Sequence, residues 1–397
     1  EDVIEIPKEY SGYSILSDDK EIINTQEING KVYCKVSLPP LSFTTFSKGE
    51  KLKRSTSNVT GYVLENELIK YTFSNDGTLI SALDKETNNG LLDGPGNVLS
   101  LYEDRPLNWD AWDIDFYYKE SLVETANAVK IKKVVSGPVL SSLEFHYTVG
   151  NSIVKQKITL GNQSKRLDFD TYVEWKEKHK MLRVHFPTNI RSEQASFDIQ
   201  YGYVKRNTHK NTSWDRAKFE VVGHKYADLS NNDNGIAVLN DCKYGYSVLD
   251  NVIDLNLLRS PNNPDADADL GDHSFTYSFY PHQNDLIRSD VIQQSTILNH
   301  PPLLFNGVKN NNSKSLINFD GKGIEITAIK KSEQSNEIIF RAVETLGKTS
   351  KGKIYFNGKV TETNLMERRN LKPAKNVNGS LAIELKPFEI KTFRCSL

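Results

Sequence analysis

Hydrophobic and polar residues alternate along most of this chain, and a period of two is typical of β-strands with one buried face. Residues 143–149 alternate in this way, and residues 154–160 do so again after Gly150-Asn151, a pair that favours a tight turn. In residues 167–175, apolar side chains and one threonine share one face, while acidic residues and a tyrosine share the other. These segments predict long antiparallel strands.

Turn residues end several of the predicted strands, whereas helical spacing is rare. Asn75-Asp76-Gly77 separates two apolar runs and is a strong turn signal. The best helix candidate is 283–298, which has apolar residues four apart and is followed by prolines. The pattern therefore predicts an all-β protein built from large sandwiches.

Two polar stretches divide the chain into three expected units. A double proline followed by a Ser/Thr/Asn-rich stretch ends the first, and a run of lysine, asparagine and serine begins the last. We expect a small β domain at 1–48 that continues a longer chain, a large β unit at 49–308, and a C-terminal β-sandwich at 309–397.

Composition excludes several classes of protein. The 397 residues carry 50 basic and 51 acidic side chains, so no general attraction to nucleic acid or to anionic membranes is expected. No apolar run is long enough to cross a bilayer. The three cysteines lie far apart and match no zinc motif, which indicates neither a disulfide framework nor a metal site and favours the cytoplasm.

The most informative segment is 99–118, which holds two of the four tryptophans among several aspartates. Sugars bind to such mixtures, because aromatic faces stack on C–H surfaces and carboxylates accept hydroxyl hydrogen bonds. We therefore predict that Trp109, Asp110, Trp112 and Asp113 bind substrate. The alternative is a structural loop whose tryptophans pack inward.

A second candidate loop follows in 259–273, where prolines and glycine interrupt any strand. Its three alternating aspartates resemble those of calcium-binding loops. However, the glycine of that motif is displaced by one position here, and its final glutamate is missing. An acidic loop facing a substrate cleft is favoured over a non-standard cation site. The predicted substrate-binding residues here are Arg259, Asp265, Asp267, Asp269, Asp272 and His273.

A third segment, 206–216, is assigned a structural role. We expect Asp215 and Arg216 to form a buried ion pair and Trp214 to pack beside it. His224 lies in a strand-like region and is interpreted as a packing residue rather than a base.

Residues 101–113, LYEDRPLNWDAWD, resemble a signature of the C-terminal half of glycoside hydrolase family 38 α-mannosidases. The similarity is to the cytosolic and vacuolar branch that bacteria and fungi share, and 64–87 resembles the opening of its mutarotase-like β-supersandwich. Further similar segments follow in order along the chain: 201–216, 219–229, 235–241, 257–261, 265–273, 363–367 and 386–392.

The resemblance implies a region of an enzyme that hydrolyses terminal α-linked mannose from glycans with retention. The family uses zinc and an aspartate nucleophile on an N-terminal barrel, and no segment here matches its His-x-Asp zinc pair. A retaining glycosidase needs two carboxyl groups about 5 Å apart across the bond. We therefore assign no catalytic and no metal residue, and we expect this chain alone to be inactive. Expected partners are mannosides, the catalytic barrel and, as an open possibility, further copies of the chain.

Two other functions stay open. A free-standing carbohydrate-binding module would use the same tryptophan loop without catalysis or metal. A mutarotase-like epimerase would need a histidine and a carboxylate that converge on a concave sheet, and no spacing in the sequence singles out such a pair.

Overall fold

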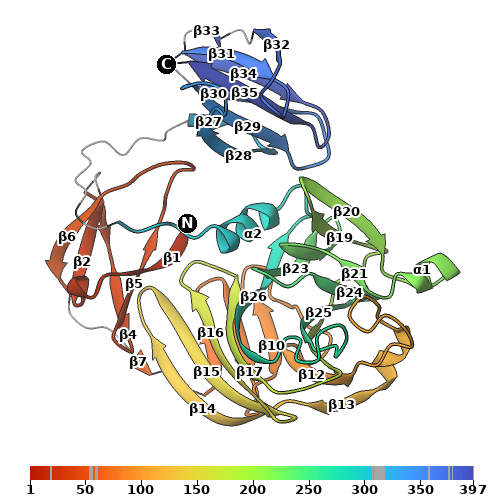
Figure 1. Ribbon diagram of the computed structural model, residues 1–397. Helices are drawn as coiled ribbons and strands as arrows, with labels where there is room; N and C mark the ends of the chain where they lie inside the picture. The colour runs from red at the N-terminus through yellow and green to blue at the C-terminus, as the bar shows by residue number, and fades with distance from the viewer. Residues whose placement is uncertain are drawn as a thin grey trace.

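The computed structural model describes residues 1–17, 20–52, 57–58, 61–305, 307, 318–355, 358–373, 376–377 and 379–396. Strands dominate these residues, as Figure 1 shows, so the predicted all-β fold is confirmed. They form a small N-terminal pair of sheets, a large central unit and a C-terminal sandwich. No helix among them is long and apolar enough to cross a membrane.

The N-terminal unit consists of two three-stranded sheets around a small apolar core that includes Ile15, Val32 and Cys34. One sheet has the order β1 (Asp2–Ile6), β5 (Lys31–Val36), β4 (Thr25–Ile28), and the other has the order β3 (Ile22–Ile23), β2 (Tyr13–Ser17), β6 (Phe46–Lys51). A short 3-10 helix, η1 (Lys8–Tyr10), joins β1 to β2.

The central unit packs a ten-stranded sheet against a six-stranded and a four-stranded sheet. The ten-stranded sheet has the order β20 (Gly202–Asn207), β19 (Gln194–Ile199), β22 (Tyr226–Ser230), β23 (Asn234–Asn240), β26 (Gly271–Gln283), β17 (Leu167–Trp175), β16 (Ser152–Gly161), β15 (Leu140–Val149), β14 (Asn127–Ser136), β7 (Ser57–Asn58). The six-stranded sheet has the order β13 (Leu122–Thr125), β12 (Val98–Glu103), β18 (Lys180–Pro187), β25 (Val252–Arg259), β24 (Gly245–Leu249), β21 (Val221–Val222). The four-stranded sheet has the order β11 (Asn89–Gly90), β10 (Leu79–Asp84), β9 (Ile69–Phe73), β8 (Val63–Glu65).

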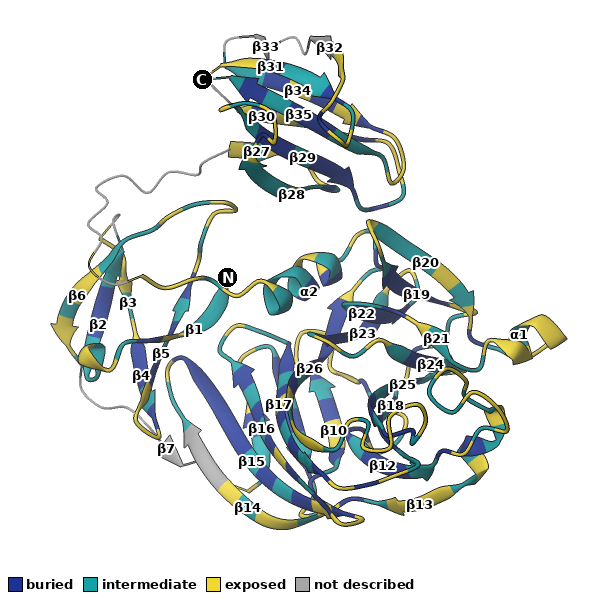
Figure 2. Ribbon diagram, in the orientation of Figure 1, coloured by how far each residue is buried: buried dark blue, intermediate teal, exposed yellow. Residues whose placement is uncertain are grey.

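Period-two patterning sets the register of the large sheet. The strands β15 and β16 form a hairpin in which Val149 pairs with Ser152 across a two-residue turn at Gly150-Asn151, as predicted. In β17 every second residue from Leu167 to Trp175 is buried, and Figure 2 shows the same alternation along neighbouring strands. A one-residue slip would move these side chains to the other face, so burial fixes the pairing.

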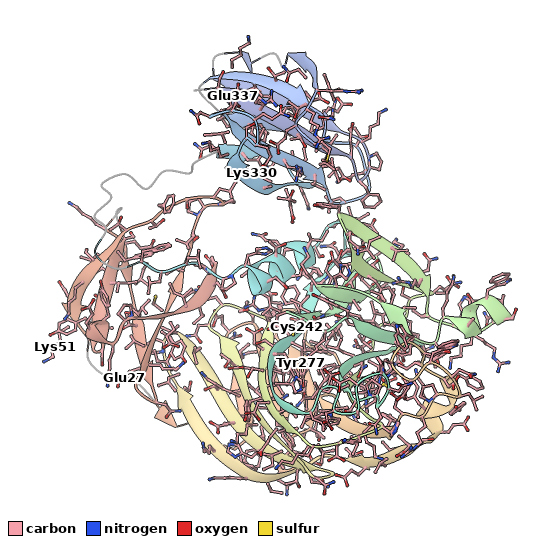
Figure 3. The ribbon with its side chains drawn as sticks, in the orientation of Figure 1. Glu27, Lys51, Cys242, Tyr277, Lys330 and Glu337 are labelled. Atoms are coloured by element: carbon pink, nitrogen blue, oxygen red, sulfur yellow. The ribbon has the colours of Figure 1, made fainter. Side chains whose placement is uncertain are left out.

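The centre of this core contains a buried polar network. Tyr277, labelled in Figure 3, donates to Asn97 at 2.6 Å and accepts from Gln156 at 2.7 Å. Asn97 in turn donates to Gln156 at 2.8 Å, so the three side chains satisfy one another. Tyr277 also stacks on Phe169 with ring centroids 4.9 Å apart. A fully satisfied network of this kind makes the packing of the two layers specific.

The C-terminal unit is a two-layer sandwich around buried residues such as Phe340, Ile354 and Phe393. One sheet has the order β27 (Asn318–Asp320), β30 (Ser350–Tyr355), β34 (Ser380–Leu385), β33 (Asn376–Val377). The other has the order β28 (Ile324–Lys331), β29 (Ile338–Glu344), β35 (Ile390–Ser396), β31 (Lys359–Thr363), β32 (Asn370–Pro373).

The predicted unit boundaries stay predictions. The strand β6 spans positions 48 and 49, and the boundary at 308–309 lies outside the described residues. The helix expected at 283–298 is shorter than predicted, since α2 covers Val291–Asn299. The preceding residues form turns instead: Asn284 has a φ of 66°, and Asp285 accepts the Arg288 amide with both its backbone and its side-chain oxygen.

Candidate functional site

The candidate site is the loop between β12 and β13, and the guanidinium of Arg259 at the end of β25 holds it in place. Arg259 Nε donates to the carboxylate of Asp104 at 2.6 Å. Its Nη atoms donate to the backbone carbonyls of Asp110 at 3.0 Å, Ala111 at 3.3 Å and Asp113. One side chain thus gathers the start and the middle of the loop, which uses the fixed fork geometry of arginine.

The two loop tryptophans point into solvent. Trp109 has a φ of 58° and is 73% exposed, and Trp112 is 72% exposed. The amides of Trp112 and Asp113 both donate to the carbonyl of Trp109, at 2.7 and 2.9 Å. The alternative in which these rings pack inward is therefore wrong. Leu107 and Phe116 are also exposed, so four large apolar side chains share a rigid loop. We call these four residues, 107, 109, 112 and 116, the tryptophan platform.

Asp110 joins the tryptophan loop to the second predicted loop. Its Oδ2 accepts the backbone amides of Asn262 at 2.6 Å and Asn263 at 3.0 Å. Its Oδ1 lies 3.6 Å from Nδ1 of His179. The structure therefore brings Asp110 and Arg259 together, although 149 residues separate them, but it uses both side chains to shape the loops.

The carboxylate of Asp104 is the most buried group of the site. Only 2% of its side chain is exposed, and its amide donates to the carbonyl of His179 at 2.8 Å. Burial raises the pKa of Asp104 above its ordinary value, although the neighbouring Arg259 charge acts in the opposite direction. The arginine is thus the partner that allows a carboxylate to lie beneath this loop.

Each acidic residue of the second loop has its own separate contacts. Asp265 accepts the Asp267 amide at 3.0 Å, and Asp267 pairs with Lys178 at 2.8 Å on the surface. His273 bonds to the carbonyl of Asp269 at 2.8 Å. Asp272 raises the pKa of Tyr172 by hydrogen bonding to its hydroxyl. These contacts do not gather the four aspartates around one point.

A buried cluster beneath the platform was not predicted. Arg183 on β18 is fully buried and donates to Asp254 at 2.6 Å and to Glu220 at 3.0 Å. Tyr118, in the 3-10 helix η2 (Phe116–Glu120), donates to Glu220 at 2.5 Å, and its ring lies 5.2 Å from the guanidinium. Burial raises the pKa of Glu220 in spite of the charge on Arg183.

This cluster anchors the C-terminal end of the tryptophan loop, just as Arg259 anchors its beginning. One sequence signal could have indicated it, since Arg183 interrupts an otherwise apolar run in residues 181–184. Its acidic partners come from distant segments and gave no comparable signal.

The structure corrects the expectation for the third segment. Asp215 and Arg216 form no ion pair, because neighbouring residues in a helix point in different directions. Asp215 instead caps α1 (Ser213–Ala217): it accepts from Thr212 Oγ1 at 2.7 Å, and its own amide donates back at 3.1 Å. Trp214 is 79% exposed rather than packed. His224, expected to pack, is half-buried beside Tyr244.

Zinc, which the family resemblance implies, does not fit the side chains of the described ranges. Within these ranges, no three histidine, cysteine, aspartate or glutamate side chains converge closely enough to bind a metal ion. The carboxylates around Arg259 are paired with the guanidinium or with backbone amides. We therefore derive no metal-dependent step from this chain.

Two family models match the sequence. The "Glycosyl hydrolases family 38 C-terminal domain" covers residues 64–267, and the "Glycosyl hydrolases family 38 C-terminal beta sandwich domain" covers residues 323–393. The first match includes the tryptophan platform and Arg259. Both matches agree with the sandwich layers described above.

Similar proteins carry mannosidase names. Alpha-mannosidase G of Dictyostelium discoideum is 37% identical over 99% of this chain and 39% of its own length. The Saccharomyces cerevisiae alpha-mannosidase is 31% identical over 91% and 38%, and human alpha-mannosidase 2C1 is 40% identical over 60% and 24%. The chain thus spans about two fifths of the first relative.

A solved alpha-mannosidase from Enterococcus faecalis V583 shares the fold. It superposes with a TM-score of 0.76 at 18% identity, and the match covers 97% of this chain and 51% of the other. The first family model by itself matches more than half of the sequence. The chain therefore belongs to glycoside hydrolase family 38, and it corresponds to the C-terminal β region of that family.

Proposed function

We propose that this chain completes the substrate pocket of an enzyme that hydrolyses terminal α-linked mannose from glycans. In this proposal the catalytic residues, and any zinc they bind, belong to a barrel outside the chain. In this proposal Trp109 and Trp112 contact sugar rings, and Arg259 and Asp110 position them by holding the loops. Asp113, Asp265, Asp267, Asp269, Asp272 and His273 stay predicted substrate-binding residues. The relatives named alpha-mannosidase support this substrate class.

The observation that carries the proposal is that the side chains of the tryptophan platform are exposed on a loop whose backbone is held by hydrogen bonds. Exposing a large aromatic side chain to water is unfavourable compared with burying it, so exposed rings on an ordered loop indicate a binding surface. Here Arg259 holds the loop through three backbone carbonyls, and Asp110 fixes the neighbouring loop. The backbone that carries both rings is therefore held before binding, which lowers the entropic cost of ordering the loop.

A direct catalytic role for the carboxylates of the loop between β12 and β13 does not fit their contacts. Asp104 is buried against Arg259, and Asp115 accepts from the Leu107 amide and from the Tyr117 hydroxyl, each at 2.7 Å. Asp110 accepts two backbone amides. These groups shape the loop, and we infer that their contribution to the reaction is to position the substrate.

The test measures hydrolysis of an aryl α-mannoside. We expect no turnover by this chain alone, with or without added zinc. Turnover under either condition would contradict the proposal that the catalytic residues lie outside this chain. In the enzyme that contains the barrel, Trp109→Ala should raise KM by about tenfold, because one stacked aromatic ring is lost. Tyr355→Ala, an exposed aromatic change on the C-terminal sandwich, is the matched control and should leave KM unchanged.

A carbohydrate-binding module without catalysis is the second candidate. The exposure of Trp109 and Trp112 without a covering segment among the described residues favours it. Saturable binding of methyl α-mannoside by this chain alone, abolished by Trp109→Ala, would support that function over pocket completion.

Location and assembly extend the proposal. We propose a cytoplasmic enzyme, and the three free cysteines of the described residues support this, since Cys242 is exposed and unpaired. Association with the catalytic barrel would cover the exposed apolar side chains around the platform, as expected for a domain interface. Homo-oligomerisation stays a prediction.

A further inference from the structure

A cavity lies between the central unit and the C-terminal sandwich, and it shares no residue with the tryptophan platform. Its volume is about 430 Å³, within the range of about 300–1,000 Å³ that small-molecule sites occupy. Figure 1 shows β28 of the sandwich facing the end of the central unit that carries α2 and β20. The lining residues include Asp198, Tyr201, His224, Lys225, Tyr244 and Glu325.

Direct contacts beside the cavity hold its two walls together. Tyr203 on β20 packs edge-on against Phe388 of the sandwich, with ring centroids 5.5 Å apart. The Tyr203 hydroxyl donates to the carbonyl of Leu346 at 3.4 Å, and Lys322 Nζ donates to the carbonyl of Arg288 at 3.4 Å. The cavity is thus a formed feature of the contact between the units.

Charged groups line this cavity without pairing directly. Asp198 is 6% exposed, and its Oδ2 accepts the Lys225 amide at 3.0 Å. Among the described residues, no donor bonds to Asp198 Oδ1, and no carboxylate lies within 4.0 Å of the Lys225 ammonium. Burial raises the pKa of both Asp198 and Glu325, while the charge of Lys225 acts against this increase. Glu325 also accepts a hydrogen bond from the Thr296 side chain. Each carboxylate can accept more than one hydrogen bond, so both carboxylates and the ammonium can still bond to a ligand in the cavity.

Two partly exposed tyrosines contribute to the lining of the cavity. Tyr244 and Tyr201 are about half exposed, at 52% and 50%, although both line the cavity. The ring of Tyr244 lies 5.2 Å from the ring of His224, which limits its freedom. Tyr201 has a φ of 58° in the tight turn between β19 and β20. Such rings offer apolar faces beside polar groups.

We propose that this cavity is a second saccharide-binding site, in which Tyr244 stacks on a neutral pyranose ring while Asp198, Glu325 and Lys225 bind its hydroxyl groups. A hydroxyl both donates and accepts, so one sugar can satisfy the carboxylates and the ammonium together. The site is built from both units, and sugar binding would therefore also hold them together. This inference is independent of the proposed mannoside hydrolysis.

Other ligand classes fit the cavity less well. Two carboxylates would repel a phosphate or other anion. A divalent cation prefers six or more oxygen ligands, whereas the lining combines two carboxylates with a lysine ammonium. Within the described part of the chain, no group of three metal-binding side chains occurs here. A neutral polyhydroxylated ring matches the mixture of donors, acceptors and aromatic faces.

The test follows the imidazole resonance of His224 in the chain by NMR, assigned with His224→Gln. Methyl α-mannopyranoside and methyl β-glucopyranoside serve as probes. We expect a saturable shift of this resonance with at least one of them. Tyr244→Ala should weaken this binding about tenfold, because the stacking face is lost. Glu325→Gln keeps the shape of the side chain and should weaken binding through the loss of a charged acceptor.

Two controls separate this site from the platform. Trp109→Ala should leave the His224 titration unchanged, and Tyr244→Ala should leave binding at the platform unchanged. Thermal unfolding verifies that each variant is folded. The proposal is overturned if no glycoside moves the His224 resonance, if Tyr244→Ala and Glu325→Gln both bind like the unaltered chain, or if calcium chloride alone produces the same saturable shift. Failure of mannoside hydrolysis would not affect any of these outcomes.

Discussion

Replacing Arg259 by methionine removes the guanidinium that holds the loop of the tryptophan platform, while keeping much of the volume of the side chain. The substitution takes away the ion pair with Asp104 and the donors to three backbone carbonyls. It leaves the Asp104 carboxylate, whose side chain is 2% exposed, without its cationic partner. We therefore expect both a loss of stability and a release of the loop.

The size of the stability loss follows from burial. Breaking a buried ion pair by removing one partner costs about 3–5 kcal/mol. The side chain of Arg259 is 16% exposed, so water can partly solvate the vacated position and the lower end of this range applies. We expect a decrease in the free energy of unfolding of about 3 kcal/mol, which corresponds to about 6–12 °C in the melting temperature of a domain of this size.

The assay is equilibrium unfolding in urea followed by far-UV circular dichroism, with limited proteolysis of the native chain as a probe of the loop. Asp104→Asn and the double variant complete a thermodynamic cycle. The double variant should be more stable than the sum of the single effects predicts, with a coupling of about 2 kcal/mol, because no charge is then left unpaired. Cleavage within 104–115 should accelerate in Arg259→Met. A loss below about 1 kcal/mol, or effects that add within about 0.5 kcal/mol, would refute the reasoning.

Two further predictions concern the scaffold. Burial lowers the pKa of His282, but the charge and hydrogen bond of Asp228 at 2.7 Å outweigh it, so the pKa lies above 6.5. This stabilisation is complete below about pH 6.5 and is lost as the pH rises through the raised pKa, so the destabilisation by His282→Gln in urea unfolding should shrink as the pH rises above about 6.5. Gly77→Ala should cost more than about 2 kcal/mol, because Gly77 has a φ of 87° and a Cβ would lie 2.4 Å from the Tyr147 hydroxyl. Gly30→Ala, with a φ of 81° and open space around it, should cost about 1 kcal/mol; equal melting temperatures for the two glycine variants would contradict this account.

Local periodicity explains why the strands could be predicted from the sequence. In β17 the buried positions are those that alternation placed on one face, because a sheet with one buried face permits only one register. The turns at Gly77 and Gly150 followed from residues that tolerate a positive φ. Strand alternation and turn type depend on residues that are adjacent in the sequence, so both can be predicted without knowing the fold.

Long-range pairing explains what the sequence did not show. The tryptophan loop could be identified from composition, but its outward rings depend on Arg259, which lies about 150 residues away. The expectation for residues 214–216 was wrong because an exposed one-turn helix can be capped locally, so Asp215 needs no arginine. Composition alone does not distinguish an exposed ring on a rigid loop from a packed one.

The cavity between the central unit and the C-terminal sandwich could not be predicted from the sequence either, because its lining residues come from distant segments. Its walls come from the end of β19 and the turn after it, the residues just before and at the start of β22, the residue before β24, the helix α2, and the C-terminal sandwich. His224 was interpreted as a packing residue because the sequence around it is strand-like, whereas the structure places it in the bend between β21 and β22. Its position at a cavity depends on where Glu325 and Tyr244 are brought by separate parts of the fold. A cavity made by two units can therefore be identified only once their contact is known, whereas the tryptophan-rich composition of residues 99–118 is visible within one segment of the sequence.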